Sequence, residues 1–355
     1  MFTDYVLLLF GTTPRRAKGM FNVLRGRRTV STLFAGLTAG CLDLLDSWHG
    51  VPLEDFMAAT AVLEENGLLI SPEAGSWQLT AAGQARWVAI QEHRYLPQAF
   101  SRFQMVDVRR FQQVSQLALQ VTSELVHHER RYYPTTTDSS IQAQVKRWLR
   151  QQSTTDLGDR VHAALTDFLT SVPTDELATV FVDSLTGYQA PGRTNDQLAM
   201  MLHRQPLETG LMRTDVSCQW VRWLQAHPDD PLWPLLAPLV QSSPVSKSAQ
   251  QTYQAFTQTH ALTKIATARK LKLSTVREHL LEVAIWLPSF PFTTVLDAQV
   301  IETLTRCFAG QPEIASWSFQ DAQAALPELD FFEFRLFQIM RCHHVGSLIV
   351  STVKN

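Results

Sequence analysis

The stretch KIATARKLKLSTVREHLLEV, residues 264–283, decides how the C-terminal part of this 355-residue chain is expected to fold. Its apolar residues recur at helical spacing on both sides of a central KLK, which predicts two short helices around a tight turn. Ile265 and Ala266 are expected to face the core from the first helix, and Val276 and Leu280 from the second. This arrangement is typical of a helix-turn-helix.

The sequence also suggests where the second of these helices begins and ends. Thr275 followed three residues later by Glu278 predicts a capping box at its start, and Pro288 limits its far end. The face opposite Val276 and Leu280 is expected to carry Glu278, Glu282 and Ile285. Two carboxylates there would repel a phosphate backbone, which argues against a strong sequence-specific reader of DNA.

Basic residues surround the predicted turn and form a patch that could neutralise phosphates. The residues expected to bind DNA here are Lys270, Lys272, Ser274, Thr275, Arg277 and His279. The alternative interpretation is a helical hairpin whose Lys and Arg side chains are merely solvated, because the same geometry also serves protein docking.

The front of the chain predicts a second module. Residues 68–71 and 76–80 flank ProGluAlaGly and predict a hairpin that follows a helix. Three helices and then a hairpin indicate a winged helix. The basic segment 15–28 is a second candidate DNA-binding patch, in which the predicted contacts are Arg25, Arg27 and Arg28. A solvated surface is the alternative for this patch also.

Helical periodicity dominates the remainder, so the fold class is expected to be mainly α and multidomain. Residues 132–140 contain Pro and hydroxyl residues and predict a loop between two helices. The predicted organisation is a winged-helix-like module with a small β-hairpin at 1–95, a helical connector at 96–150, an acidic helical middle domain at 151–245, a helix-turn-helix domain at 246–345 and a tail at 346–355.

Composition and motifs argue against several classes of protein. The formal net charge is −2 and the sequence pI about 6.6, so any attraction to nucleic acid must be local. The four cysteines lack CxxC spacing, which predicts reduced thiols, a cytoplasmic location and no metal. No phosphate-binding GxxxxGK[ST] loop or catalytic signature occurs, and the apolar start is too short for a membrane span. We therefore expect neither enzymatic activity nor a cofactor.

Three segments resemble a known domain. Residues 252–256, 265–280 and 329–337 are similar to the helicase helix-turn-helix domain, which ends some RecQ-type helicases and also a family of stand-alone bacterial YpbB-like proteins. Members of that family are typically encoded beside a RecQ-type helicase. The resemblance implies a helicase-associated protein without ATPase parts of its own.

Three functional hypotheses follow. The first is a non-catalytic accessory that binds duplex or forked DNA and acts with a RecQ-type helicase in replication, recombination or repair. The second is a transcription regulator, because residues 274–280 also resemble the recognition helix of LuxR-type regulators. The third is a protein-interaction scaffold that binds no DNA.

Overall fold

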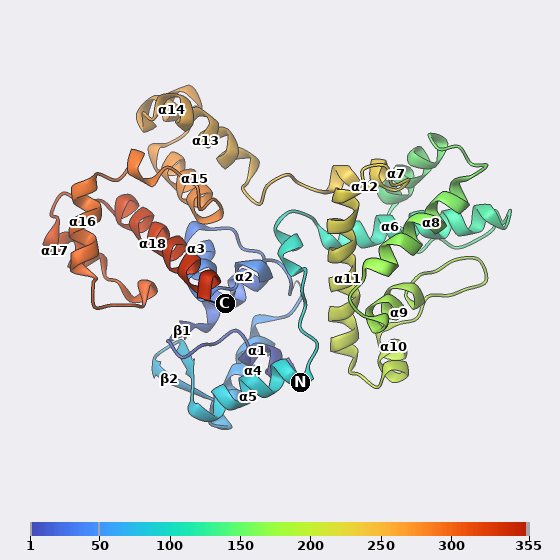
Figure 1. Cartoon of the computed structure of the whole chain (residues 1–355), viewed down its shortest axis with the longest axis horizontal. Helices are drawn as coiled ribbons and strands as arrows, with labels where there is room; N and C mark the ends of the chain where they lie inside the picture. Colours follow the sequence, from blue (N-terminus) through green and yellow to red (C-terminus); the bar gives the residue numbers. More distant parts are fainter. Residues whose placement is uncertain (1, 49, 353–355) are drawn as a thin grey trace. The chain divides into compact units, whose positions relative to one another are not determined.

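The computed structural model describes residues 2–48 and 50–352 (Figure 1). The chain forms two compact units. Unit 1 combines residues 3–85 with the C-terminal segment from residue 243, and unit 2 contains residues 86–242 together with Phe2. The N-terminal and C-terminal parts of the described chain therefore fold together in unit 1, and the domain boundaries expected from the sequence stay predictions.

The N-terminal part of unit 1 is a winged helix, as expected. Its three-stranded antiparallel sheet has the order β1-β3-β2, with Leu69 opposite Leu79 and Arg15 opposite Trp77. Gly75 has a φ of +82° in the hairpin turn, a conformation that glycine adopts without strain. The elements are α1 (Phe2–Leu7), β1 (Arg15–Arg16), α2 (Ala17–Leu24), α3 (Val30–Ala39), η1 (Leu42–Leu44), α4 (Leu53–Glu65), β2 (Leu69–Glu73), β3 (Ser76–Leu79) and α5 (Ala81–His93), which continues into unit 2.

The C-terminal part of unit 1 is built around one central helix, α15. Val276, Leu280 and Val283 on this helix are fully buried, because α13, α14, α18 and α3 all pack against it. Its far end at Trp286 lies just before Pro288, as expected. The elements are α13 (Lys247–Thr259), α14 (Leu262–Ala268), α15 (Leu273–Trp286), η4 (Phe292–Thr294), α16 (Ala298–Cys307), η5 (Ile314–Ser316), α17 (Phe319–Ala325) and α18 (Phe331–Thr352).

Helix α3 joins the two parts of unit 1. Besides packing on α15, it places the ring of Phe34 under the guanidinium of Arg335 from α18, 3.9 Å from the ring centroid. Phe331 lies 5.1 Å from the same guanidinium. Burial lowers the pKa of Arg335 to about 10 because it removes water from the guanidinium. The two aromatic rings stabilise the positive charge where water does not.

Unit 2 is helical and its core is aromatic. Trp220 is 2% exposed and lies 5.6 Å from Phe111, 5.9 Å from Phe168 and 5.3 Å from Phe181 between ring centroids, so it forms the centre of this core. The elements are η2 (Phe100–Gln104), α6 (Val108–Val126), α7 (Ser139–Arg150), α8 (Leu157–Ser171), α9 (Asp175–Asp183), α10 (Asn195–Leu202), α11 (Pro206–Ala226), α12 (Trp233–Leu236) and η3 (Ala237–Leu239).

Candidate nucleic-acid interface

The turn between α14 and α15 presents two exposed lysines. Lys270 adopts a left-handed conformation with φ of +53°, and the Leu271 N–H donates to the Ala266 carbonyl at 2.9 Å, which closes the turn. Ile265 and Ala266 are buried beneath it, as expected. The side chains of Lys270 and Lys272 are exposed. The backbone of the turn therefore holds Lys270 and Lys272 close together, and both cationic side chains extend from the same part of the surface.

Helix α15 begins earlier than the sequence suggested. Its N-cap is Lys272, whose side chain makes no capping hydrogen bond, and Thr275 already lies inside the first turn. The predicted capping box of Thr275 and Glu278 is therefore wrong, because Thr275 lies beyond the N–H groups that it would have to cap. An uncapped first turn leaves N–H donors and the positive end of the helix dipole at the surface, where they favour anions.

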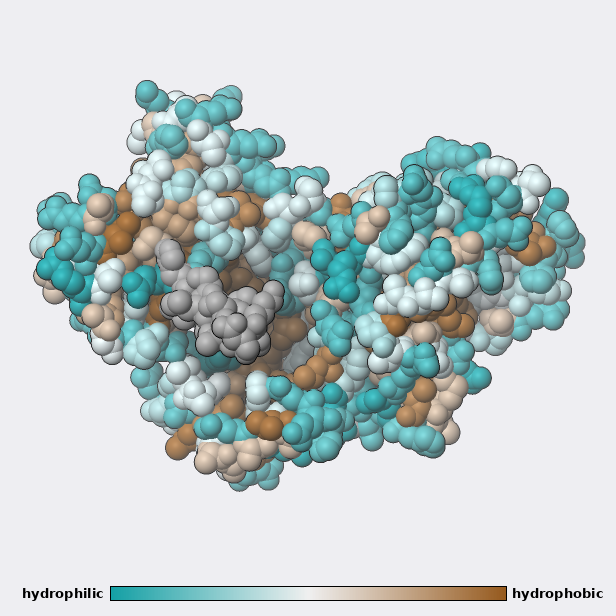
Figure 2. Space-filling view, in the orientation of Figure 1, coloured by the Kyte–Doolittle hydropathy of each residue, from teal (hydrophilic) through white to brown (hydrophobic). Residues whose placement is uncertain are grey.

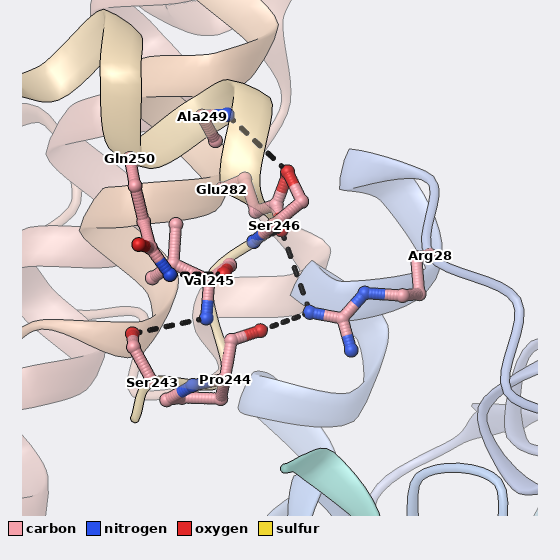
Figure 3. A network of polar contacts seen from close by, with 8 residues as sticks. All are labelled: Arg28, Ser243, Pro244, Val245, Ser246, Ala249, Gln250 and Glu282. Atoms are coloured by element: carbon pink, nitrogen blue, oxygen red, sulfur yellow. Dashed lines mark hydrogen bonds and ion pairs between the residues drawn. The ribbon is translucent and has the colours of Figure 1, made fainter. Parts of the chain in front are cut away.

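The expected acidic face of α15 is also wrong. Glu282 is 8% exposed and Ile285 2%, because the starts of α13 and α3 cover this side of the helix. Glu282 accepts hydrogen bonds from the backbone N–H of Ser246 at 2.8 Å and from its hydroxyl at 2.9 Å, and it pairs with Arg28 at 3.4 Å (Figure 3). Of the two carboxylates, only Glu278 remains exposed to repel a phosphate.

Two other residues expected to bind DNA make contacts within unit 1. Arg277 pairs with Asp330 at 2.7 Å and lies 5.4 Å from the ring centroid of Phe332. His279 Nδ1 lies 2.7 Å from the hydroxyl of Thr252 on α13. Burial lowers the pKa of His279, and the positive charge of Arg269 lowers it further. Both residues are half-buried, as is Thr275, whereas Ser274 is exposed.

The turn itself lies in a long stretch of sequence without acids. From Pro231 to Arg277 the sequence contains no Asp or Glu, and its basic residues are Lys247, Lys264, Arg269, Lys270, Lys272 and Arg277. All four lysines are exposed. Arg269 instead donates to the Ser248 carbonyl at 2.8 Å and to Gln251 at 2.8 Å. This long acid-free segment can be read from the sequence and indicates a basic surface, although the helix-turn-helix pattern alone does not show it.

The second predicted patch is partly occupied by internal contacts. Arg25 donates to the Val51 carbonyl at 3.0 Å and lies over the ring of Phe21. Arg28 donates to the Pro244 carbonyl and pairs with Glu282. Arg27 is exposed. Arg28 therefore contacts the helix-turn-helix domain. None of the described contacts joins Arg25, Arg27 or Arg28 to Lys270 or Lys272.

Helices α13, α14 and α15, with the tight turn before α15, define a helix-turn-helix protein. Residues 248–338 match the family described as "Helix-turn-helix domain". The chain is also 24% identical to Protein YpbB of Bacillus subtilis (strain 168) over 299 residues, which cover 80% of this chain and 82% of that protein. The resemblance to the helicase helix-turn-helix domain and to YpbB-like proteins is therefore confirmed. No solved structure matches the chain.

Two further observations concern other kinds of site. Within the described part of the chain, no three His, Cys, Asp or Glu residues gather in a way that could hold a metal ion. None of the described helices is both long enough and apolar enough to cross a membrane.

Proposed function

We propose that this protein is a non-catalytic DNA-binding accessory that acts with a RecQ-type helicase in DNA replication, recombination or repair. The observation that carries the DNA contact is the basic turn of the helix-turn-helix, with Lys270 and Lys272 exposed beside the uncapped start of α15. Lysines and helix N-termini are two recurrent phosphate-binding devices, and here they coincide.

The burial of α15 favours recognition of DNA shape over recognition of sequence. All residues of this helix from Leu280 to Ile285 are buried, so only its first turns are accessible to a groove. Ser274 and Thr275 are the side chains there that are not engaged elsewhere in the described contacts and could reach base edges. A transcription regulator requires more base contacts than this surface offers, which makes that alternative weaker.

The helicase partnership rests on resemblance. Residues 252–256, 265–280 and 329–337 resemble a domain that ends some RecQ-type helicases. Residues 248–338 match a helix-turn-helix family, and the chain resembles YpbB over most of its length. In the proposed function, this protein carries that domain as a separate chain and provides a DNA contact for a helicase bound to the same DNA. In this account the helicase hydrolyses ATP and the accessory binds the DNA.

The first experiment compares a fork, a plain duplex and a single strand of matched length by fluorescence anisotropy of the full chain, at low and at physiological salt. We expect salt-sensitive binding with preference for the fork, because phosphate contacts release counterions. An operator-like preference for one duplex sequence would support the regulator instead. Absence of binding to all three DNAs would support the scaffold.

A second experiment tests the partnership. A RecQ-type helicase from the same organism unwinds a fork with and without this protein, and its ATP hydrolysis is followed in parallel. We expect more unwinding at limiting helicase when this protein is present, and no ATP hydrolysis by this protein alone. Equal unwinding in both reactions, without co-retention of the two proteins on the fork, would reject the partnership.

A further inference from the structure

Helix α4 occupies the position at which a winged helix presents its recognition helix, directly before the β2–β3 hairpin (Figure 1). Phe56, Ala59, Thr60 and Leu63 form its buried side. The opposite side carries exposed residues at helical spacing, namely Glu54, Ala58, Ala61, Val62 and Glu65. Within unit 1, α2 and β2 are the main elements packed on α4, and the helix-turn-helix packs on α3 instead.

The charge of this region excludes a phosphate-binding role. From Thr29 to Ala85 the sequence contains no Lys or Arg, and its acidic residues are Asp43, Asp46, Glu54, Asp55, Glu64, Glu65 and Glu73. A surface that binds DNA must neutralise phosphates with cations. A recognition helix that carries only carboxylates would repel the backbone on both sides of the groove, so α4 does not read DNA.

Helix stability explains only some of these acids. Glu54 and Asp55 lie in the first turn, where carboxylates stabilise the helix dipole. Glu64 and Glu65 lie in the last turn, where a negative charge costs about 0.3–1 kcal/mol. Glu64 accepts a hydrogen bond from the Trp77 indole at 2.8 Å, whereas Glu65 has no ion pair among the contacts described. Local folding therefore does not account for Glu65.

Apolar side chains are exposed among these carboxylates. Val62 on α4 is 43% exposed, and Ile70 on the adjacent strand β2 is 50% exposed. Figure 2 shows apolar residues interspersed with hydrophilic ones in the lower part of the view, where Figure 1 labels α4, α5 and β2. Apolar side chains ringed by charge of one sign are typical of a protein-docking surface.

We propose that this surface docks a basic segment of a partner protein. The surface, called the α4 face below, consists of Glu54, Asp55, Val62, Glu65 and Ile70. Apolar side chains of the partner pack against Val62 and Ile70, and its Lys or Arg residues pair with Glu54 and Glu65. A second copy of this chain does not fit, because a symmetric contact would place the carboxylates of both copies opposite one another. The inference goes beyond the proposed function and does not depend on the DNA contact.

The test uses the full chain and a fluorescein-labelled amphipathic peptide of alternating Lys-Lys and Leu-Leu pairs as the probe. Glu65→Lys should weaken binding of this peptide about tenfold, since it replaces attraction by repulsion at the surface. Val62→Ser should weaken it severalfold by removing apolar contact area. Asp167→Lys is the matched control, because Asp167 is an exposed acid on helix α8 of unit 2. It should leave binding within about twofold of the wild type.

Each other outcome overturns the proposal. No saturable binding of the peptide to the wild type, or equal weakening by Glu65→Lys and Asp167→Lys, would remove the α4 face as the docking site. Loss of duplex DNA binding in Glu65→Lys would make the occupant DNA. Concentration-dependent dimerisation in light scattering that Glu65→Lys abolishes would make it a second copy. Because the peptide assay contains no DNA, its failure is distinct from a failure of the proposed DNA contact.

Discussion

Arg28 and Glu282 are 254 residues apart in the sequence and form an ion pair at 3.4 Å. Arg28 follows α2 of the winged helix, and Glu282 lies on α15 of the helix-turn-helix domain. The same carboxylate accepts two hydrogen bonds from Ser246, whose hydroxyl caps the start of α13. A single buried carboxylate thus links the front of the chain to the first and third helices of the candidate DNA-binding domain.

Glu282→Gln should lower the free energy of unfolding of unit 1 by about 1–3 kcal/mol, because a neutral amide cannot accept from both Ser246 donors and also pair with Arg28. The loss should appear as a lower denaturation midpoint and as faster hydrogen exchange at the first amides of α13. Glu278→Gln is the control on the same helix, and its exposed side chain should leave both quantities nearly unchanged. Equal effects of the two substitutions would contradict the role given to Glu282.

Unit 1 should lose stability in mild acid through His279. Burial lowers the pKa of His279 in the folded state below its ordinary value of 6.5, so the unfolded state binds the proton more readily. This contribution is complete above pH 6.5 and is lost as the pH falls through the lowered folded pKa. His279→Asn keeps a polar partner for Thr252 but does not titrate. We expect a smaller drop in denaturation midpoint between about pH 7.5 and 5.5 for the variant than for the wild type, and an equal drop would refute this.

Asp215 should be essential to unit 2. It is fully buried and accepts hydrogen bonds from the Tyr95 hydroxyl at 2.6 Å, the Gln98 and Ala99 N–H groups at 3.0 and 2.7 Å, and the Gln219 amide at 2.9 Å. Asp215→Ala leaves these donors without an acceptor and should lower the free energy of unfolding of unit 2 by about 3–5 kcal/mol. The exposed Asp229→Ala is the control for denaturation. Similar midpoints for both variants would show that the network contributes little.

Arg277 should matter more for stability than for DNA. Arg277→Ala removes the ion pair with half-exposed Asp330 and the contact with the buried ring of Phe332. It should lower the free energy of unfolding of unit 1 by about 1 kcal/mol. Its effect on duplex affinity should be smaller than that of substituting Lys270 or Lys272. Denaturation and anisotropy on the same preparations compare the two effects. A larger loss of affinity than of stability would place Arg277 in the DNA contact.

Local patterns in the sequence predicted the local structure well. The helix-turn-helix and the β2–β3 hairpin follow from short-range periodicity and turn residues, and the structure confirms both. The class of fold follows from the same signals. These features depend on neighbouring residues, which a single sequence displays directly.

The error about Glu282 concerns contacts between distant parts of the chain. Helical periodicity predicts an exposed face for Glu282, but the starts of α13 and α3 cover it, and no local pattern in the sequence indicates a partner such as Arg28. The capping box failed for a local reason, because the turn ends at Lys272 and the helix starts before Thr275. Two long segments, by contrast, show charge of one sign directly in the sequence: among charged side chains, residues 29–85 carry only acids, and residues 231–277 carry only Lys and Arg. They indicate opposite roles for the winged helix and the helix-turn-helix domain.

The central claim is that Lys270 and Lys272 contact DNA phosphates. The most direct test measures duplex affinity against salt concentration for the wild type, for Lys270→Glu/Lys272→Glu, and for the control Lys146→Glu/Arg150→Glu, which changes two exposed cations on α7 of unit 2. We expect the first variant to bind more weakly and its salt slope to fall by about two counterions, while the control behaves as the wild type. An unchanged affinity and salt slope for Lys270→Glu/Lys272→Glu would contradict the account.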